Sequence, residues 1–161
     1  MPSLSQMKVK LYLIGKIEQT HYQALSKLYL SRLKHYIPCE LIIQEGAKIS
    51  NATAEQVRDK DSAHILARLK ISDYKIVLEK SGSSFDSEEF ARWLQQKTIH
   101  HRGDLSFIIG GPLGLSRTLI ERADLCLSLS AMTLPHEMCA VVLLEQLYRA
   151  VSILRREKYH K

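Results

Sequence analysis

Apolar and polar residues alternate, or apolar residues run together, in five short segments of the chain. Such segments predict β-strands when glycine, proline or polar loops bound them. KVKLYLI is an example, because its alternation stops at Gly15. The five predicted strands cover residues 8–14, 39–45, 74–80, 104–110 and 125–130.

Between the predicted strands the apolar residues recur at helical spacing. In the first such segment Tyr22, Leu25 and Tyr29 fall on one face, and Pro38 follows its end. The final helix starts after Pro135, since proline is well tolerated in a first turn. The predicted helices cover residues 19–36, 53–70, a segment from an N-cap at Asp86 or Ser87 to about Thr98, 116–123 and 136–156.

Strands and helices alternate throughout the 161 residues. This order predicts an α/β fold with a mostly parallel sheet of five or six strands, flanked by helices. The chain contains no internal repeat, low-complexity segment or linker, and its length is ordinary for one domain. We therefore expect residues 1–161 to form a single domain.

Three loops that follow predicted strands carry small and polar residues. They read LEKSGSS (78–84), GGPLGLS (110–116) and SLSAMTLPHE (128–137). Ligands bind outside the carboxyl ends of parallel strands, so these loops can converge on one pocket. GGPLGLS is neither a Walker loop nor GxGxxG. By itself it indicates either a turn that faces a ligand or simply a tight turn.

The final helix is apolar nearly all round in its first two turns, which a surface helix does not tolerate. It is therefore either central to the core or buried against another subunit, and we favour a homodimer. Glu145 and Arg149 lie four residues apart in this helix. They form either an ion pair within the helix or a site at which the arginine is shared between subunits.

The chain is basic, with a net charge of +6 and a pI near 9.3. The excess is concentrated at the end of the chain, in Arg149, Arg155, Arg156, Lys158 and Lys161. A local basic patch favours a polyanionic partner, RNA or DNA, over the alternative of a protein that is basic without such a partner.

Cys39, Cys126 and Cys139 lack CxxC or Cys-His metal spacing, so we expect reduced thiols, no metal site and a cytoplasmic protein. The N-terminal MPSLSQMK lacks the apolar region of a signal peptide. The longest apolar run, residues 138–144, is far too short to span a bilayer. We therefore expect no membrane association.

Four motifs occur in a fixed order and spacing: GGPLG, LSLSAMTLPH, LLEQLYRA and a terminal YHK. In this arrangement, which covers essentially the whole chain, the sequence resembles the RlmH-type rRNA methyltransferases of the SPOUT superfamily. The resemblance implies an α/β fold with a C-terminal trefoil knot and a homodimer. It also implies S-adenosylmethionine-dependent methylation of N3 of a pseudouridine in the helix 69 loop of large-subunit (23S) rRNA, on assembled ribosomes.

The same resemblance assigns site residues by their position in these motifs. The cofactor pocket would comprise Leu78, Gly111, Ser130, Ala131, Met132, Thr133, Leu134 and Pro135. Arg149, His136, Tyr159 and His160 would lie near the target base, some of them donated across the dimer. The uracil-type N3–H must lose its proton as the methyl group arrives, so a base, or a cation that stabilises the anion, would assist. His136 either takes this part or simply braces the start of its helix.

The chain departs from the family pattern at three places. Ala140 stands where the family usually carries an arginine, Glu137 adds a negative charge, and no lysine follows Gly82. These departures remove two cations near the site and leave the cofactor loops in place. The alternative functions are a non-catalytic RNA-binding or ribosome-assembly factor on the same scaffold, and a nucleotide-binding α/β enzyme unrelated to RNA.

Overall fold

The central sheet has five parallel strands in the order β2-β1-β4-β3-β5 in the computed structural model, which describes residues 6–160. The strands are β1 (Val9–Ile14), β2 (Cys39–Gln44), β3 (Tyr74–Ser84), β4 (Leu105–Ile109) and β5 (Leu125–Ser128). The predicted α/β class with a parallel sheet is therefore confirmed, and all five strands were anticipated.

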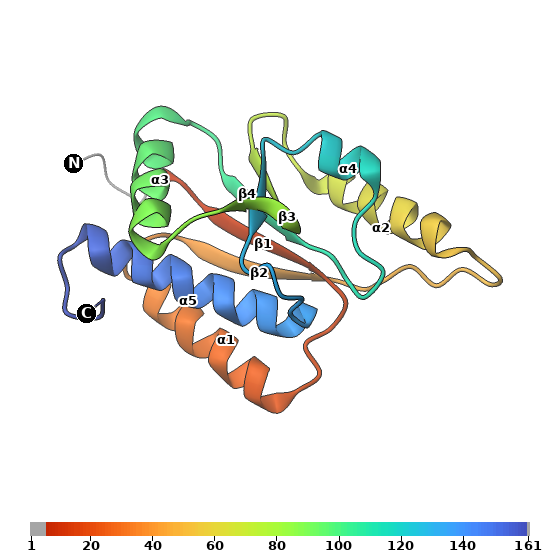
Figure 1. Ribbon diagram of the computed structural model, residues 1–161, viewed down its shortest axis with the longest axis horizontal. Helices are drawn as coiled ribbons and strands as arrows, with labels where there is room; N and C mark the ends of the chain where they lie inside the picture. The colour runs from red at the N-terminus through yellow and green to blue at the C-terminus, as the bar shows by residue number, and fades with distance from the viewer. Residues whose placement is uncertain (1–5, 161) are drawn as a thin grey trace.

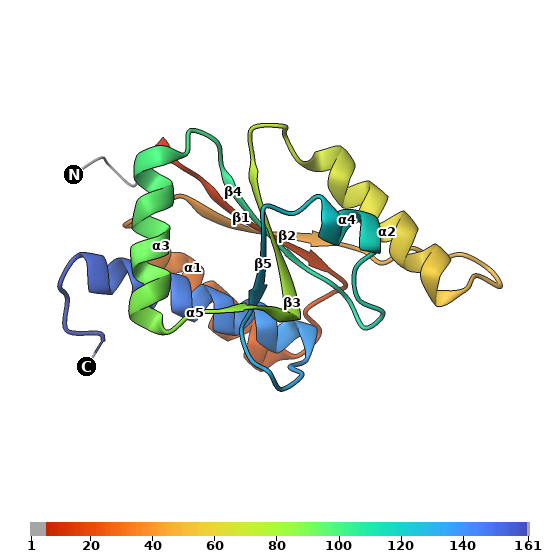
Figure 2. The ribbon, with the colours of Figure 1, turned by 45° about the horizontal axis from the view of Figure 1, so that its top comes forward.

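Helices cover both faces of the sheet (Figures 1 and 2). One layer holds α1 (Thr20–Leu33), α3 (Ser87–His100) and α5 (His136–Leu154), and the other holds α2 (Ala54–Arg68) and α4 (Arg117–Glu121). Side-chain caps fix the N-termini of three of these helices. Thr53 and Asp86 each form a capping box, at α2 and α3, and the Ser116 hydroxyl accepts the N–H of Leu119 at the start of α4. The predicted N-cap at Asp86 is thus confirmed.

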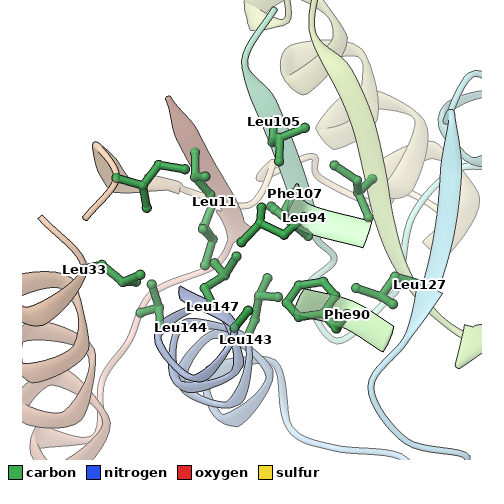
Figure 3. Packing of buried hydrophobic residues seen from close by; sticks show 14 of the residues in the cluster. Leu11, Leu33, Phe90, Leu94, Leu105, Phe107, Leu127, Leu143, Leu144 and Leu147 are labelled. Carbon is green, nitrogen blue, oxygen red and sulfur yellow. The ribbon is translucent and has the colours of Figure 1, made fainter. Parts of the chain in front are cut away.

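All six side chains of β1 are buried, because helices cover the sheet on both sides. Leu11 faces the layer of α1, α3 and α5, whereas Tyr12 packs into a second cluster under α2 and α4. Figure 3 shows leucines of α5 pointing between the sheet and its two neighbouring helices. The apolar first turns of α5 are explained by this central position, so the core interpretation of this helix is confirmed.

Strand β3 is longer than predicted, since residues 81–84 belong to it rather than to a loop. Leu78 and Ser83 both align with Leu127 of β5, so the register shifts between them. A Cβ added at Gly82 would lie 2.5 Å from the carbonyl oxygen of Cys126. The sequence SGSS has no apolar period, and only pairing with the edge strand β5 holds it extended.

The three cysteines are free thiols and partly buried, as expected for reduced cysteines. Burial raises the pKa of the Cys39 thiol to about 12, so it is a poor nucleophile. Within residues 6–160, no helix is both long and apolar enough to cross a bilayer.

Candidate functional site

A cavity of about 540 Å³ opens where β4 and β5 end, beside the middle of β3. Its wall comes from the three segments that the sequence singled out: residues 78–80 within β3, and parts of 109–115 and 127–136. Its volume is in the range of small-molecule sites, and its lining is rich in leucines, with Glu79 and Lys80 as its acidic and basic residues. The expected convergence is confirmed for the loops after β4 and β5, whereas the third segment contributes residues of strand β3 rather than a loop.

The GGPLG loop approaches the cavity as a tight turn. The N–H of Gly114 donates to the carbonyl of Gly111 at 2.9 Å, and Gly114 has φ +79°, a left-handed value that favours glycine. A Cβ at Gly111 would lie 3.2 Å from the carbonyl oxygen of Ile14, so the turn packs closely on the end of β1. The two glycines thus bring the backbone of the turn close to the cavity, which Pro112 and Leu115 also line.

Seven of the eight residues predicted to bind a cofactor line the cavity. They are Leu78, Gly111, Ser130, Met132, Thr133, Leu134 and Pro135. Ala131 does not belong to the lining and is exposed. The bend at this point is supported locally, because the Ser130 hydroxyl accepts the N–H of Met132 at 3.0 Å.

His136 also lines the cavity and braces a neighbouring loop. Its Nε2 lies 3.3 Å from the carbonyl oxygen of Lys16. A carbonyl can only accept, so Nε2 carries a proton in this contact, and in the neutral ring Nδ1 is then the acceptor. Gly15, at φ +105°, gives the ring room, since a Cβ there would lie 3.2 Å from Nε2. The bracing role is therefore observed, and it leaves one ring nitrogen for chemistry.

Glu137, the unusual acid of this segment, is buried and holds the same loop. Its carboxylate accepts the N–H groups of Glu18 and Gln19 at 3.2 and 3.3 Å. These donors precede the first turn of α1, which has no side-chain cap of its own. The charge thus has a structural explanation in this chain.

Arg149, Tyr159 and His160 meet at the other end of α5. Arg149 pairs with Glu145, stacks on Tyr159 with 4.9 Å from its guanidinium carbon to the ring centre, and lies 3.4 Å from Nδ1 of His160. Tyr159 donates to the same Glu145 carboxylate at 3.1 Å. Three of the four residues predicted near the target base therefore form one cluster.

The two remaining contacts of Tyr159 come from residues that the sequence did not indicate as functional. Its hydroxyl lies 3.4 Å from that of Tyr29, and its ring packs edge-on at 4.7 Å from that of Tyr148. Tyr29 belonged only to the predicted apolar face of α1. Nothing in its spacing distinguishes a tyrosine that packs from one that also hydrogen-bonds.

The charge state of this cluster follows from its contacts. The hydrogen bond with Glu145 raises the pKa of the Arg149 guanidinium. Burial, together with the hydrogen bonds to Tyr29 and Glu145, raises the pKa of the Tyr159 phenol well above its usual range. Near neutral pH Arg149 is thus a cation, and Tyr159 is a proton donor rather than a base.

Within one chain the cavity and the Arg149 cluster are far apart. His136 and Arg149 lie on the same helix, about 20 Å from each other at the α-helical rise. The four residues predicted near the target base therefore divide between two places. One chain by itself does not bring the Arg149 cluster to the cavity.

The other two departures from the expected pattern are also explained by position. Ala140 is fully buried in the core cluster, so its side chain does not face the cavity. No lysine follows Gly82, but Lys80, two residues before this glycine, lines the cavity. No group of three or more potential metal ligands occurs in the part of the chain that the structure describes.

Comparison with known proteins agrees with these motifs. The family model described as "Predicted SPOUT methyltransferase" matches residues 7–160. The chain is 40% identical to the ribosomal RNA large subunit methyltransferase H of Carboxydothermus hydrogenoformans, covering 96% of this chain and all of that protein. It is 40% identical to the protein of that name from Christiangramia forsetii (96% and 99% covered), and 35% identical to that from Enterococcus faecalis (96% and 100%).

Proposed function

This chain belongs to the predicted SPOUT methyltransferase family, and from that premise we propose that it methylates large-subunit rRNA with S-adenosylmethionine as the methyl donor. The observation that carries the proposal is the cavity of about 540 Å³ at the carboxyl ends of β4 and β5, built from the loops that carry the family motifs. The names of its relatives support rRNA as the substrate. In finer detail, the proposed target is N3 of a pseudouridine in the helix 69 loop, on assembled ribosomes in the cytoplasm. The single domain and the trefoil knot belong to the same proposal.

The cavity suits the proposed cofactor in shape and chemistry. The close turn at Gly111 leaves backbone groups and apolar side chains to face an adenine, and the segment from Ser130 to Pro135 would enclose the rest of the molecule. Glu79 and Lys80 provide charges of both signs for an amino acid moiety. When bound, S-adenosylmethionine supplies a methyl group on a sulfonium centre. The protein's own contribution would be to position the two reactants and to exclude water.

The N3–H of the target base must lose its proton during the transfer. His136 lines the cavity and has Nδ1 as its acceptor nitrogen, and His160 is held beside Arg149. Arg149 would stabilise the negative base or hold a phosphate, and Tyr159 would stack on a base. These roles need the Arg149 cluster and the cavity to meet.

A homodimer would bring them together. A second copy of the chain that packs against the first with the two α5 helices antiparallel would carry the partner subunit's Arg149 toward the cavity. Mixing two inactive variants tests this arrangement: Arg149→Ala, and Gly111→Val, which would obstruct the cavity. Activity that returns in the mixed dimers supports a shared site. Mixed dimers that stay inactive argue that each chain completes its own.

Mass spectrometry of rRNA nucleosides tests the substrate. Ribosomes from cells that lack the protein should lack one methylpseudouridine, and the purified protein should restore it. If no methylpseudouridine disappears, the substrate is wrong. Isothermal titration with S-adenosylmethionine distinguishes the enzyme from a non-catalytic RNA-binding factor, because absence of binding at high micromolar concentrations would exclude the enzyme.

A further inference from the structure

Four tyrosines gather at the C-terminal end of α5: Tyr29, Tyr36, Tyr148 and Tyr159. Tyr148 lies at their centre, because its ring is 4.7 Å from that of Tyr159 and 6.1 and 6.2 Å from the rings of the other two. The guanidinium of Arg32, on α1, lies 5.6 Å from the ring of Tyr29 and 5.4 Å from that of Tyr148. Of the four tyrosines, only Tyr159 belongs to the residues proposed to contact the target base.

The chain reverses its direction directly after α5. Arg156 has φ +56°, a left-handed value, and the N–H of Glu157 donates to the carbonyl of Ser152 at 2.9 Å. Glycine is the usual residue at such a helix end, because a side chain disfavours this backbone conformation. An arginine at this position indicates that contacts of the residues that follow it hold the reversed chain.

Two hydroxyl groups from the side of α1 make such contacts. Tyr36, just after α1, donates its hydroxyl proton to the carboxylate of Glu157 at 2.8 Å. Tyr159 has a single hydroxyl proton, which it donates to Glu145 at 3.1 Å. At 3.4 Å from this oxygen, the hydroxyl of Tyr29 is therefore the donor to Tyr159. The end of the chain is thus tied to the α1 side at two positions, 157 and 159.

We propose that Tyr29 and Tyr36 are positioning residues for methyl transfer, which hold the end of the chain so that Tyr159 and His160 face the target base. The proposal rests on the proposed function, because it concerns how residues proposed to contact the base are held. Tyr29 acts through Tyr159, and Tyr36 acts through Glu157. A side chain on a loose chain end spends little time in the orientation that the reaction needs.

The two hydroxyl groups can be removed without loss of the aromatic packing. The hydrogen bond between Tyr36 and Glu157 is exposed to solvent, so it contributes little to the free energy of unfolding of the whole chain. Tyr29→Phe and Tyr36→Phe each remove one hydroxyl group and keep the ring. The two substitutions together should loosen residues 155–160 and leave the rest of the domain folded.

Hydrogen-exchange mass spectrometry tests whether the hydroxyl groups hold the end of the chain. In a protein with both Tyr29→Phe and Tyr36→Phe, the amides of residues 155–160 should exchange about tenfold faster, with wild-type exchange elsewhere. Tyr22→Phe is the matched control, because Tyr22 is a half-buried tyrosine of α1 that lies outside this cluster. Wild-type exchange of residues 155–160 in the folded double variant would overturn the proposal.

Steady-state methylation of ribosomes separates positioning from cofactor binding. We expect kcat to fall about threefold in each single variant and about tenfold in the double variant. The KM for S-adenosylmethionine should stay unchanged, because neither Tyr29 nor Tyr36 lines the cofactor cavity. Tyr22→Phe should keep the wild-type value of both constants. Faster exchange together with wild-type kcat, or an equal loss of kcat in Tyr22→Phe, would also overturn the proposal.

A double-mutant cycle tests whether Tyr36 acts through Glu157. Glu157→Ala should lower kcat by the same factor as Tyr36→Phe, and the combination should lower it no further, because both substitutions remove one contact. Losses that multiply in the combined variant would show that Tyr36 acts elsewhere, and its assignment as a positioning residue would be wrong.

The hydrogen-exchange measurement requires no methyl transfer. A wild-type protein that does not methylate rRNA would refute the proposed function, and the positioning role would fall with it. An active wild-type protein whose Tyr29→Phe and Tyr36→Phe variants keep its kcat would refute the positioning role alone. The two failures are therefore distinguishable.

Discussion

The guanidinium of Arg149 pairs with the carboxylate of Glu145 one turn earlier on α5. Of the two interpretations that the sequence left open for this spacing, the ion pair within the helix is therefore observed. The pair does not exclude a role in binding, since Arg149 also stacks on Tyr159 and its side chain is 26% exposed. A second partner can reach the cation without breaking the pair.

Arg149→Ala should weaken rRNA binding and methyl transfer by about 10- to 100-fold, the range for loss of a hydrogen bond with a charged group. S-adenosylmethionine binding should stay unchanged, because Arg149 does not line the cavity and its proposed role is toward the RNA. Filter binding to ribosomes and isothermal titration measure the two effects. Arg68→Ala is the control, since Arg68 lies on α2 and stacks on Tyr12. Equal losses in the two variants would contradict a specific role for Arg149.

Glu137→Gln should lower the free energy of unfolding by about 1–2 kcal/mol, because the amide oxygen replaces only one of two acceptors for the N–H groups of Glu18 and Gln19. Urea denaturation measures the change. Glu121→Gln is the matched control: its ion pair with Arg117 is exposed, and its loss should have little effect. If Glu137→Gln leaves the free energy of unfolding unchanged, the carboxylate does not hold the loop before α1.

Gly82→Ala should destabilise the protein by several times as much as Gly46→Ala. An added Cβ at position 82 would overlap the backbone of Cys126 at 2.5 Å, whereas nothing lies within 4 Å of one at position 46. The pairing of β3 with β5 must open to admit the methyl group, which should cost more than about 2 kcal/mol. Thermal unfolding compares the two variants. Similar melting temperatures would mean that residues 81–84 are not paired with β5 as described.

The unfolding free energy should depend on pH at both extremes through Lys10 and Asp104, which form an ion pair at 2.7 Å. Burial opposes ionisation of Asp104, but the hydrogen bonds from Lys10 and Lys8 outweigh it and lower its pKa below 3.8. This stabilisation is present above pH 3.8 and is lost as the pH falls through the pKa of the folded state.

Lys10 has the opposite pH dependence. Burial alone would lower its pKa, but the bond with Asp104 raises it above 10.5, so its contribution is present below pH 10.5 and is lost as the pH rises through the pKa of the folded state. Asp104→Asn should therefore flatten both limbs of a plot of unfolding free energy against pH. Asp59→Asn, an exposed control, should retain them. Retention of both limbs in Asp104→Asn would assign the dependence to other groups.

Local patterns along the chain were sufficient to predict the α/β class, the five strands and the loops of the cavity. The period of apolar residues depends on which faces of an element are buried, so the sequence of residues 8–14 was enough to predict a strand. The cap at Asp86 involves residues only three positions apart, and it too could be predicted. The small and polar residues after β4 and β5 likewise indicated the cavity, because parallel strands place their carboxyl ends at one edge.

Other features depend on residues that are distant in the sequence. Pairing with β5 turns residues 81–84 into a strand, and Glu137 acts on N–H groups that lie well over a hundred positions earlier. The contact between the hydroxyl groups of Tyr29 and Tyr159 also arises only when α5 packs between α1, α3 and the sheet. A sequence pattern records what each segment buries, but not which distant atom it meets. Tertiary packing therefore decided how the candidate residues are grouped.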